Sequence, residues 1–356
     1  MEQKSVLIGM SGGVDSSVAA ALLKEQGYHV IGATMRLWTY SDSCNMKHEG
    51  CCAESAVEDA RRVCDKLGID FYVMNFKDMF KDKVVDYFVD EYIHGRTPNP
   101  CIACNKYLKF DALLKKALAM GIDYVATGHY AKIEKGEDGK YILRASEAVK
   151  KDQSYVLYNF TQEQLAHTLM PLGGYNKDWV RQKAEELGLG VAHKPDSQEI
   201  CFVEDDDYAK FITDYSGYKP KEGDILDVNG NVIGKHRGLI YYTIGQRKGI
   251  GAYGRPMFVM KIDAENNTIT LGEKGMEFSN ELTAYDVNFV SGEFPKENML
   301  ITAKVRYQAP HAAAMLCPQK DGTVKLMFPE PQRAVTPGQA VVFYDGDIVL
   351  GGGTVL

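Results

Sequence analysis

The sequence predicts an α/β protein in which a doubly wound, mostly parallel sheet is followed by two small β-rich or β-barrel domains. Strand-like apolar runs alternate with amphipathic segments of helix length in the first part of the chain, and this helical period disappears after Gly217. From Lys219 onward, short apolar alternations are separated by turn sequences. We therefore expect three domains, at residues 1–216, 217–278 and 279–356.

The predicted elements follow one another in a regular order. An apolar run at 5–10, a helical pattern at 16–26 and an extended run at 28–35 predict a βαβ unit. The chain continues with helices near 54–67, 77–93 and 109–120, strands at 70–76 and 123–127, a hairpin around 137–139, and helices near 161–170 and 176–188. Hairpin turns are expected at 228–231, 265–267, 321–322 and 345–346. Ligands of a parallel sheet bind at the carboxyl ends of its strands, so we expect the functional site there.

The composition is that of a globular protein with more than one core, because 45% of the residues are hydrophobic and 25% are charged. The apolar run at 6–10 is too short for a signal peptide or a membrane span, so we expect a cytoplasmic protein without a membrane partner. Eight cysteines in such a chain favour thiol chemistry or metal ligation over a disulfide scaffold. The net charge of −7 is unusual for a nucleic-acid binder, but residues 218–356 carry as many basic as acidic side chains.

A glycine-rich turn joins the first predicted strand to the first predicted helix. The stretch Ser11-Gly12-Gly13-Val14-Asp15-Ser16-Ser17 lies where backbone N–H groups and the helix dipole form an anion site. No lysine follows the glycines, which excludes the Walker loop of γ-phosphate-hydrolysing enzymes. The serine hydroxyls can donate to phosphate oxygens, and Asp15 is suited to hold a bridging Mg²⁺. The alternative interpretation is an ordinary glycine turn capped by Ser16.

Two cysteine-containing segments lie in or beside predicted loops of the same domain. One contains Cys101 and Cys104 in a Cys-x-x-Cys pattern, and the other contains Cys201. From the residues alone, the pair could be a redox dithiol, half of a zinc site or two ordinary thiols. Further potential ligands occur in a polar stretch, but their spacing fits no zinc-finger pattern and no metal ligand is assigned: Cys44, His48, Cys51 and Cys52.

Together these features resemble a known enzyme family. The Ser-Gly-Gly-x-Asp-Ser loop resembles that of the PP-loop ATP pyrophosphatases, whose domain is of the adenine nucleotide α-hydrolase type. With the cysteine segments added, the sequence resembles the tRNA-specific 2-thiouridylases. The resemblance covers nearly the whole chain and continues through 127–130 (TGHY), 151–155 (KDQSY), 243–249 (TIGQRKG), 305–307 (VRY) and 337–339 (PGQ).

The resemblance implies that ATP adenylates O2 of the wobble uridine of a tRNA and that sulfur then replaces this oxygen. It implies ATP contacts at Gly9, Met10, Ser11, Gly12, Gly13, Val14, Asp15, Ser16, Met35 and Gly128. Cys201 would carry a persulfide and Cys104 would be its partner nucleophile, which leaves a Cys104–Cys201 disulfide to be reduced. The resemblance also implies that a helical part of the first domain, at about 145–216, contacts the tRNA. The residues that would contact the target base or the tRNA are Asn99, Pro100, Cys101, His129, Lys151, Asp152, Gln153, Arg306, Tyr307 and Gln339.

The implied partners are tRNAs with wobble uridines, of the Lys, Glu and Gln acceptor types, and a cysteine desulfurase or sulfur-relay protein as persulfide donor. One departure from the family pattern is that Cys101 stands where the family has Asp after Asn-Pro. Cys101, Cys104 and Cys201 would then be possible ligands of a [4Fe–4S] cluster that delivers sulfide. Two other functions stay open at this point: a PP-loop ligase that acts on a small metabolite, and a non-catalytic RNA-binding protein.

Overall fold

The first domain is built on a five-stranded parallel sheet. The computed structural model describes residues 3–38, 54–196, 200–203 and 206–356. The sheet has the strand order β3-β2-β1-β4-β7, and every pairing in it is parallel. Its strands are β1 (Ser5–Gly9), β2 (His29–Arg36), β3 (Asp70–Asn75), β4 (Tyr124–Ala126) and β7 (Thr168–Leu169).

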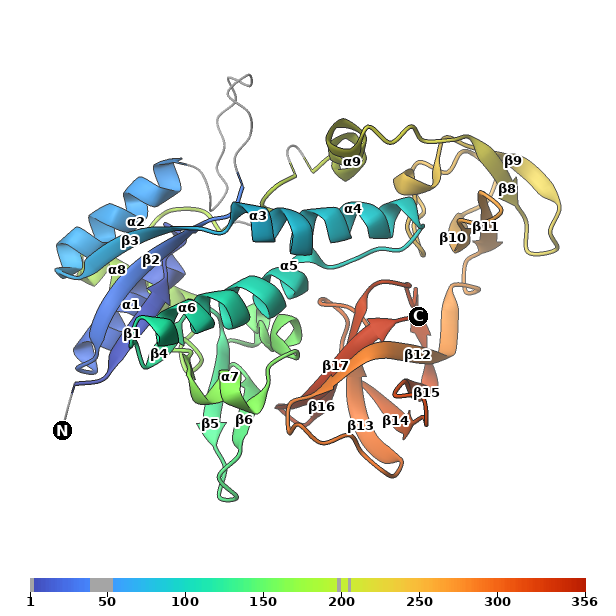
Figure 1. Cartoon of the computed structure of the whole chain (residues 1–356). Coiled ribbons are helices and arrows are strands. Elements are labelled where there is room, and N and C mark those ends of the chain that lie inside the picture. The colour runs from blue at the N-terminus through green and yellow to red at the C-terminus, as the bar shows by residue number, and fades with distance from the viewer. Residues whose placement is uncertain (1–2, 39–53, 197–199, 204–205) are drawn as a thin grey trace.

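Helices cover both faces of this sheet, as predicted (Figure 1). Side chains of β1 alternate between two cores: Val6 and Ile8 pack in one, and Leu7 packs in the other. The first core contains residues of α1 (Val14–Glu25), α2 (Glu54–Leu67) and α8 (Lys177–Glu186). The second contains residues of two long helical stretches: α3 (Lys77–Phe80), η1 (Lys81–Val85) and α4 (Asp86–Ile93), then α5 (Pro100–Ala103), η2 (Cys104–Ala112) and α6 (Leu113–Ala119).

Three helices differ from the sequence prediction. The helix expected at 109–120 begins at Pro100, because Asn99 caps it through a bond from the Cys101 amide and proline suits a first helical position. Both cysteines of the Cys-x-x-Cys pattern are therefore on a helix rather than in a loop. The helix expected at 161–170 is only α7 (Gln162–Ala166), because Thr168 and Leu169 pair with β4 instead. A helix that was not predicted, α9 (Tyr208–Ser216), packs its buried residues into the second core.

A hairpin and two short 3₁₀ turns lead away from the sheet. The hairpin is formed by β5 (Ala131–Lys135) and β6 (Tyr141–Ala145). The turns η3 (Val149–Lys151) and η4 (Ser154–Leu157) follow it. The hairpin also connects the first domain to the C-terminal barrel, because β6 pairs with the barrel strand β17 (Ile348–Val355).

The remaining strands form two β units, as expected. The smaller has the strand order β10-β11-β8-β9 and includes the short η5 (Leu239–Tyr241). Its strands are β8 (Gly223–Leu226), β9 (Val232–His236), β10 (Met257–Asp263) and β11 (Thr268–Glu273). The larger is a six-stranded barrel, closed because β12 pairs with both β15 and β17. It comprises β12 (Phe278–Phe289), β13 (Met299–Lys304), β14 (Ala312–Pro318), β15 (Val324–Arg333), β16 (Ala340–Asp345) and β17.

All four predicted hairpin turns join consecutive strands of these units. In the part of the chain that the structure describes, no helix is long and apolar enough to cross a membrane.

Candidate active site

A cavity of about 360 Å³ opens at the carboxyl ends of β1, β2 and β4. This is the position that a doubly wound sheet offers to a ligand, because β1 and β4 are neighbours from which the chain proceeds in opposite directions. All ten residues for which the family resemblance implies ATP contacts line it: Gly9, Met10, Ser11, Gly12, Gly13, Val14, Asp15, Ser16, Met35 and Gly128. The cavity is also lined by Lys109, His129, Lys151, Gln153 and Lys194.

The glycine-rich loop leaves the first turn of α1 available to an anion. Gly13 occupies the N-cap position, where it provides no capping side chain. The Ser16 hydroxyl accepts from the Ser11 amide at 3.2 Å and donates to the Gly13 carbonyl, so it stabilises the loop internally. Gly12 has φ of +69°, a conformation that favours glycine. The loop is thus held by its own side chains while the helix dipole points into the cavity.

Gly128 allows the loop after β4 to approach the start of α1. A Cβ atom at this position would lie 2.6 Å from the Ser16 amide nitrogen and 2.8 Å from the Asp15 carbonyl carbon. Both neighbours are backbone atoms of the phosphate loop, so they cannot rotate away. The absence of a side chain at Gly128 is therefore part of the geometry of the cavity.

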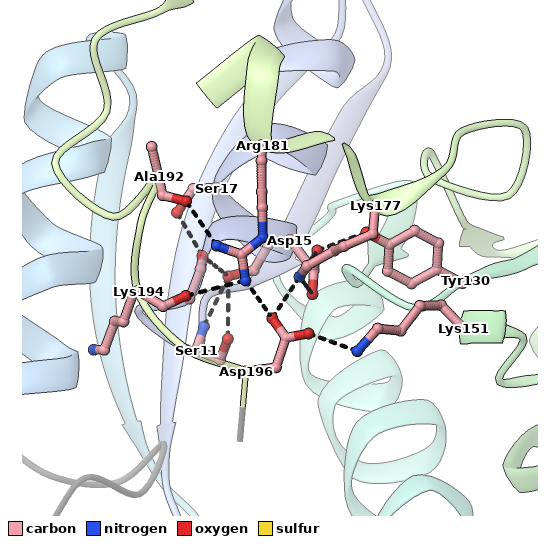
Figure 2. A network of polar contacts seen from close by, with 12 residues as sticks. Ser11, Asp15, Ser17, Tyr130, Lys151, Lys177, Arg181, Ala192, Lys194 and Asp196 are labelled. Carbon is pink, nitrogen blue, oxygen red and sulfur yellow. Dashed lines mark hydrogen bonds and ion pairs between the residues drawn. The ribbon is translucent and has the colours of Figure 1, made fainter. Parts of the chain in front are cut away.

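Charged side chains from three segments meet beside Asp15 (Figure 2). Lys177, at the start of α8, donates to both carboxylate oxygens of Asp15, at 2.7 and 2.8 Å, and lies 2.7 Å from Asp196. Asp196 also pairs with Lys151 at 2.6 Å and with Arg181 at 3.4 Å. Partial burial alone would raise the pKa of Asp196, but Lys151 and Lys177 lower it below its ordinary value.

Lys194 approaches the loop from the other side. Its ammonium donates to the Gly12 carbonyl at 3.2 Å and to Asp59 at 2.9 Å. Lys194 and Asp196 belong to one short segment that follows α8, and this segment ends five residues before Cys201. The segment that leads to Cys201 is thus bound to the phosphate loop by ion pairs on both sides of Pro195.

Two residues after β4 are buried and uncharged. Burial, assisted by the positive charge of Lys109, holds the pKa of His129 well below its ordinary value, so its imidazole is neutral near pH 7. One ring nitrogen, Nδ1, is 2.7 Å from the Thr127 hydroxyl. Tyr130 donates its phenolic hydrogen to Asp15 at 2.7 Å, and burial together with the Asp15 charge raises the pKa of Tyr130. Tyr130 therefore helps Lys177 to orient Asp15.

The helix that begins at Pro100 presents two thiols differently. Cys101 is exposed, yet partial desolvation by the surrounding protein raises the pKa of its thiol, with Lys109 opposing this shift. Cys104 is buried, with 8% of its surface exposed, and belongs to the same core as Leu108 and Phe110. Limited access therefore restricts the reactivity of the Cys104 thiol in this conformation.

Cys201 is exposed, whereas its neighbour Phe202 is buried among Phe80, Phe88 and Phe211. This aromatic contact anchors the segment that carries Cys201. Cys104 and Cys201 are separate thiols in the described structure. Residues 197–199 and 204–205 lie outside the described part, as do Cys44, His48, Cys51 and Cys52.

Cys101, Cys104 and Cys201 are all described, and within the described residues no group of three His, Cys, Asp or Glu side chains is arranged to hold a metal ion. The described structure therefore gives no support to a [4Fe–4S] cluster on these cysteines. Asp15 differs, because a single carboxylate beside a phosphate site is the usual protein contribution to a Mg²⁺ that travels with a nucleotide.

The residues expected to contact tRNA are in three places, because His129, Lys151 and Gln153 line the cavity and the others form two further groups. Asp152 and Tyr307 lie together, because the Tyr307 hydroxyl donates to the Asp152 carbonyl at 3.1 Å. The ammonium nitrogen of Lys304, from β13, lies 5.7 Å from the ring centre of Tyr307. Arg306, which precedes Tyr307 in the chain, is exposed. Asn99 and Pro100 begin the cysteine helix, and Gln339 donates to the carbonyl of Thr97 at 2.9 Å, just before it.

Sequence reasoning missed several charged residues of the cavity and its surroundings. Lys177, Arg181 and Lys194 belong to no recognised pattern, and their pairing partners are distant in the sequence. Lys177 carried one usable signal: it follows Asn176, a typical N-cap residue, and so would begin a helix.

Comparison with known protein families agrees with this architecture. Residues 4–205 match the family described as tRNA methyl transferase HUP domain, residues 209–273 its PRC-barrel domain, and residues 279–355 the aminomethyltransferase beta-barrel domain. The fold and the loop thus define a protein of the PP-loop superfamily with two appended β domains.

Full-length relatives give the family more specifically. A tRNA-specific 2-thiouridylase MnmA of Acetivibrio thermocellus is 59% identical over 358 residues, with 100% of both chains covered. One of Clostridioides difficile is 58% identical over 354 residues, with 99% of this chain and 98% of the relative covered. The chain belongs to the tRNA-specific 2-thiouridylase family.

Proposed function

We propose that this protein uses ATP to replace the 2-oxygen of a tRNA wobble uridine by sulfur, which makes it a tRNA-uridine 2-sulfurtransferase. One observation carries the proposal: a single cavity gathers all ten residues that the family resemblance associates with ATP, in a chain that matches 2-thiouridylases over its full length. The cavity has a helix N-terminus for phosphates and basic side chains around it.

The first step is activation of the uridine. The 2-oxygen attacks the α-phosphorus of ATP, pyrophosphate leaves, and the base carries AMP on O2. A carbonyl oxygen is a poor leaving group, and this step converts it into a good one. Asp15 would hold the Mg²⁺ that accompanies ATP, and this ion supplies charge neutralisation for the phosphates. The neutral imidazole of His129 is suited to a hydrogen bond with the base or the adenylate rather than to an ion pair.

The second step transfers sulfur. The terminal sulfur of a Cys201 persulfide attacks C2 and AMP departs, leaving the base joined to Cys201 through two sulfur atoms. The Cys104 thiolate then attacks the Cys201 sulfur and breaks the sulfur–sulfur bond, so the outer sulfur stays on the base as a thiocarbonyl. The Cys104–Cys201 disulfide that results takes two electrons from a thiol reductant before the next turnover. Because Cys104 is buried and Cys201 exposed in the described structure, this step requires Cys104 to become accessible.

The proposed partners follow from this chemistry. A persulfide on Cys201 has to be supplied by a cysteine desulfurase or a sulfur-relay protein, and the exposure of Cys201 suits such a transfer. The tRNA would be one with a wobble uridine, of the Lys, Glu or Gln acceptor type, with its anticodon base flipped out of the stack. Basic and aromatic side chains near the cysteine helix, such as Lys304 and Tyr307, are suited to the RNA backbone and bases. The cytoplasm, where tRNA and ATP are available, is the compartment that this function requires.

The decisive experiment is tRNA-dependent release of AMP and pyrophosphate by the purified protein, with mass spectrometry of the tRNA for 2-thiouridine. We expect nucleotide cleavage only with a tRNA that has a wobble uridine. Equal pyrophosphate release with a small acid or nucleotide in place of tRNA would indicate a small-metabolite ligase instead. Binding of tRNA without any cleavage of ATP would indicate a non-catalytic RNA-binding protein.

A further inference from the structure

Lys177 is held by two carboxylates that come from different segments (Figure 2). Its ammonium lies 2.7 and 2.8 Å from the two oxygens of Asp15 and 2.7 Å from one oxygen of Asp196. An ammonium group has three hydrogens to donate, so these contacts use its whole capacity. Only 12% of the side chain is exposed. Lys177 is therefore fixed in place rather than placed loosely at the surface.

This geometry also fixes how close the two carboxylates are. An oxygen of Asp15 and an oxygen of Asp196 each lie 2.7 Å from the same nitrogen, so they are separated by no more than twice that distance. Two carboxylates at such a separation repel each other unless a cation lies between them. In the described structure this cation is Lys177. A carboxylate such as that of Asp15 is also a preferred ligand of a divalent metal ion.

Lys177 is a more important source of compensating positive charge for Asp15 than for Asp196. Asp196 has two further basic partners, Lys151 and Arg181. The only other side-chain partner of Asp15 in the described residues is the neutral hydroxyl of Tyr130. Loss of Lys177 would leave Asp15 without a compensating cation, whereas Asp196 would keep two.

We propose that Lys177 is a positioning residue that occupies the cation position of Asp15 in the nucleotide-free protein and is exchanged there for the Mg²⁺ of incoming MgATP. After the exchange Lys177 keeps its bond to Asp196, and its two released hydrogens are available to phosphate oxygens. The empty site is thereby closed to free metal and accepts a metal only together with a nucleotide. The inference rests on the proposed function only in taking ATP as the ligand of the loop.

The test is the binding of Mn²⁺, measured by electron paramagnetic resonance of the free ion, to protein without nucleotide. For Lys177→Met we expect one new site per chain with an affinity at least about tenfold above that of the wild type, because a positive charge between two carboxylates is removed. The double variant Lys177→Met with Asp15→Asn should lose this site. Lys177→Arg should resemble the wild type, since it keeps the charge. A variant of Lys183, which is on the same helix but pairs with Glu25 at 2.9 Å, is the matched control and should bind no additional Mn²⁺.

The inference is overturned if folded Lys177→Met, as judged by circular dichroism, binds Mn²⁺ no more tightly than the wild type. If this variant does not fold, a comparison of the wild type with Asp15→Asn decides. In the presence of α,β-methylene-ATP, the wild type should bind Mn²⁺ at least about tenfold more tightly than Asp15→Asn does. Equal affinities would overturn the exchange. None of these measurements uses tRNA or sulfur, so a chain that shows the exchange but does not thiolate tRNA would contradict the proposed function alone.

Discussion

Substitution of Gly128 by alanine tests whether the close approach of two loops forms the nucleotide cavity. The added Cβ would be 2.6 Å from the Ser16 amide nitrogen, and an ordinary contact begins near 3.4 Å, so the two backbones must separate by about 0.8 Å. Overpacking of this kind typically costs about 1–3 kcal/mol of the free energy of unfolding. A displacement of this size in a site that positions reacting groups lowers the rate by up to about 100-fold.

The assay for Gly128→Ala combines urea denaturation with the ATP dependence of pyrophosphate release in the presence of tRNA. We expect lower stability and a lower kcat/KM for ATP. Gly174→Ala is a suitable control, because a Cβ there would have no atom within 4 Å and the backbone is not left-handed. If Gly128→Ala matches this control in both stability and ATP dependence, the cavity does not depend on the approach of the two loops, and the reasoning is refuted.

Three further predictions address the cysteines, the buried histidine and the barrel. Cys201→Ser and Cys104→Ser should each abolish 2-thiouridine in mass spectra while a single turnover of tRNA-dependent pyrophosphate release remains; loss of pyrophosphate release would contradict their assignment to the sulfur step. Because burial holds the pKa of His129 far below 6.5, the unfolded chain binds a proton that the folded one does not. Stability should therefore fall below about pH 6.5, by up to about 1.4 kcal/mol per pH unit, and urea denaturation of His129→Gln should show a weaker dependence. Gln339→Ala removes one hydrogen bond to Thr97 and should cost about 1 kcal/mol of stability and raise the KM for tRNA; an unchanged KM would argue against a role of this bond in tRNA binding.

The fold was largely predictable because its signals are local. Alternating apolar and helical segments predicted the parallel sheet, and turn sequences such as Asp321-Gly322 predicted the hairpins of the barrel. The start of the cysteine helix was missed because the signal at Asn99 and Pro100 was interpreted as a base contact rather than a helix cap. The strand β7 could not be predicted, since its two residues depend on pairing with β4.

The site was predictable in part, for a related reason. The phosphate loop is contiguous in the sequence, and a glycine-rich stretch between a strand and a helix has a physical interpretation of its own. The charges around it are not contiguous, because Lys177 is 162 residues from Asp15 and no periodicity connects them. The roles of Cys104 and Cys201 and the domain boundaries at 216/217 and 278/279 stay predictions.

The C-terminal barrel has a structural consequence for the cysteine helix. Its loop before β16 lies against the residues that lead into that helix: the Thr97 amide donates to the Pro337 carbonyl, and Gln339 donates to the Thr97 carbonyl, both at 2.9 Å. Between them, Gly338 has φ of +88°, and a Cβ there would lie 2.9 Å from the Thr97 nitrogen.

Thr97 is thus bound to the barrel through both its backbone N–H and its backbone C=O, two residues before the helix cap Asn99. The helix that carries Cys101 and Cys104 begins at a point fixed by the barrel as well as by its own sequence. A protein without the barrel would keep the phosphate loop, which is built from the first domain alone, but would lose this support of the cysteine helix. We therefore expect the barrel to affect sulfur transfer and tRNA binding more than it affects the affinity for ATP.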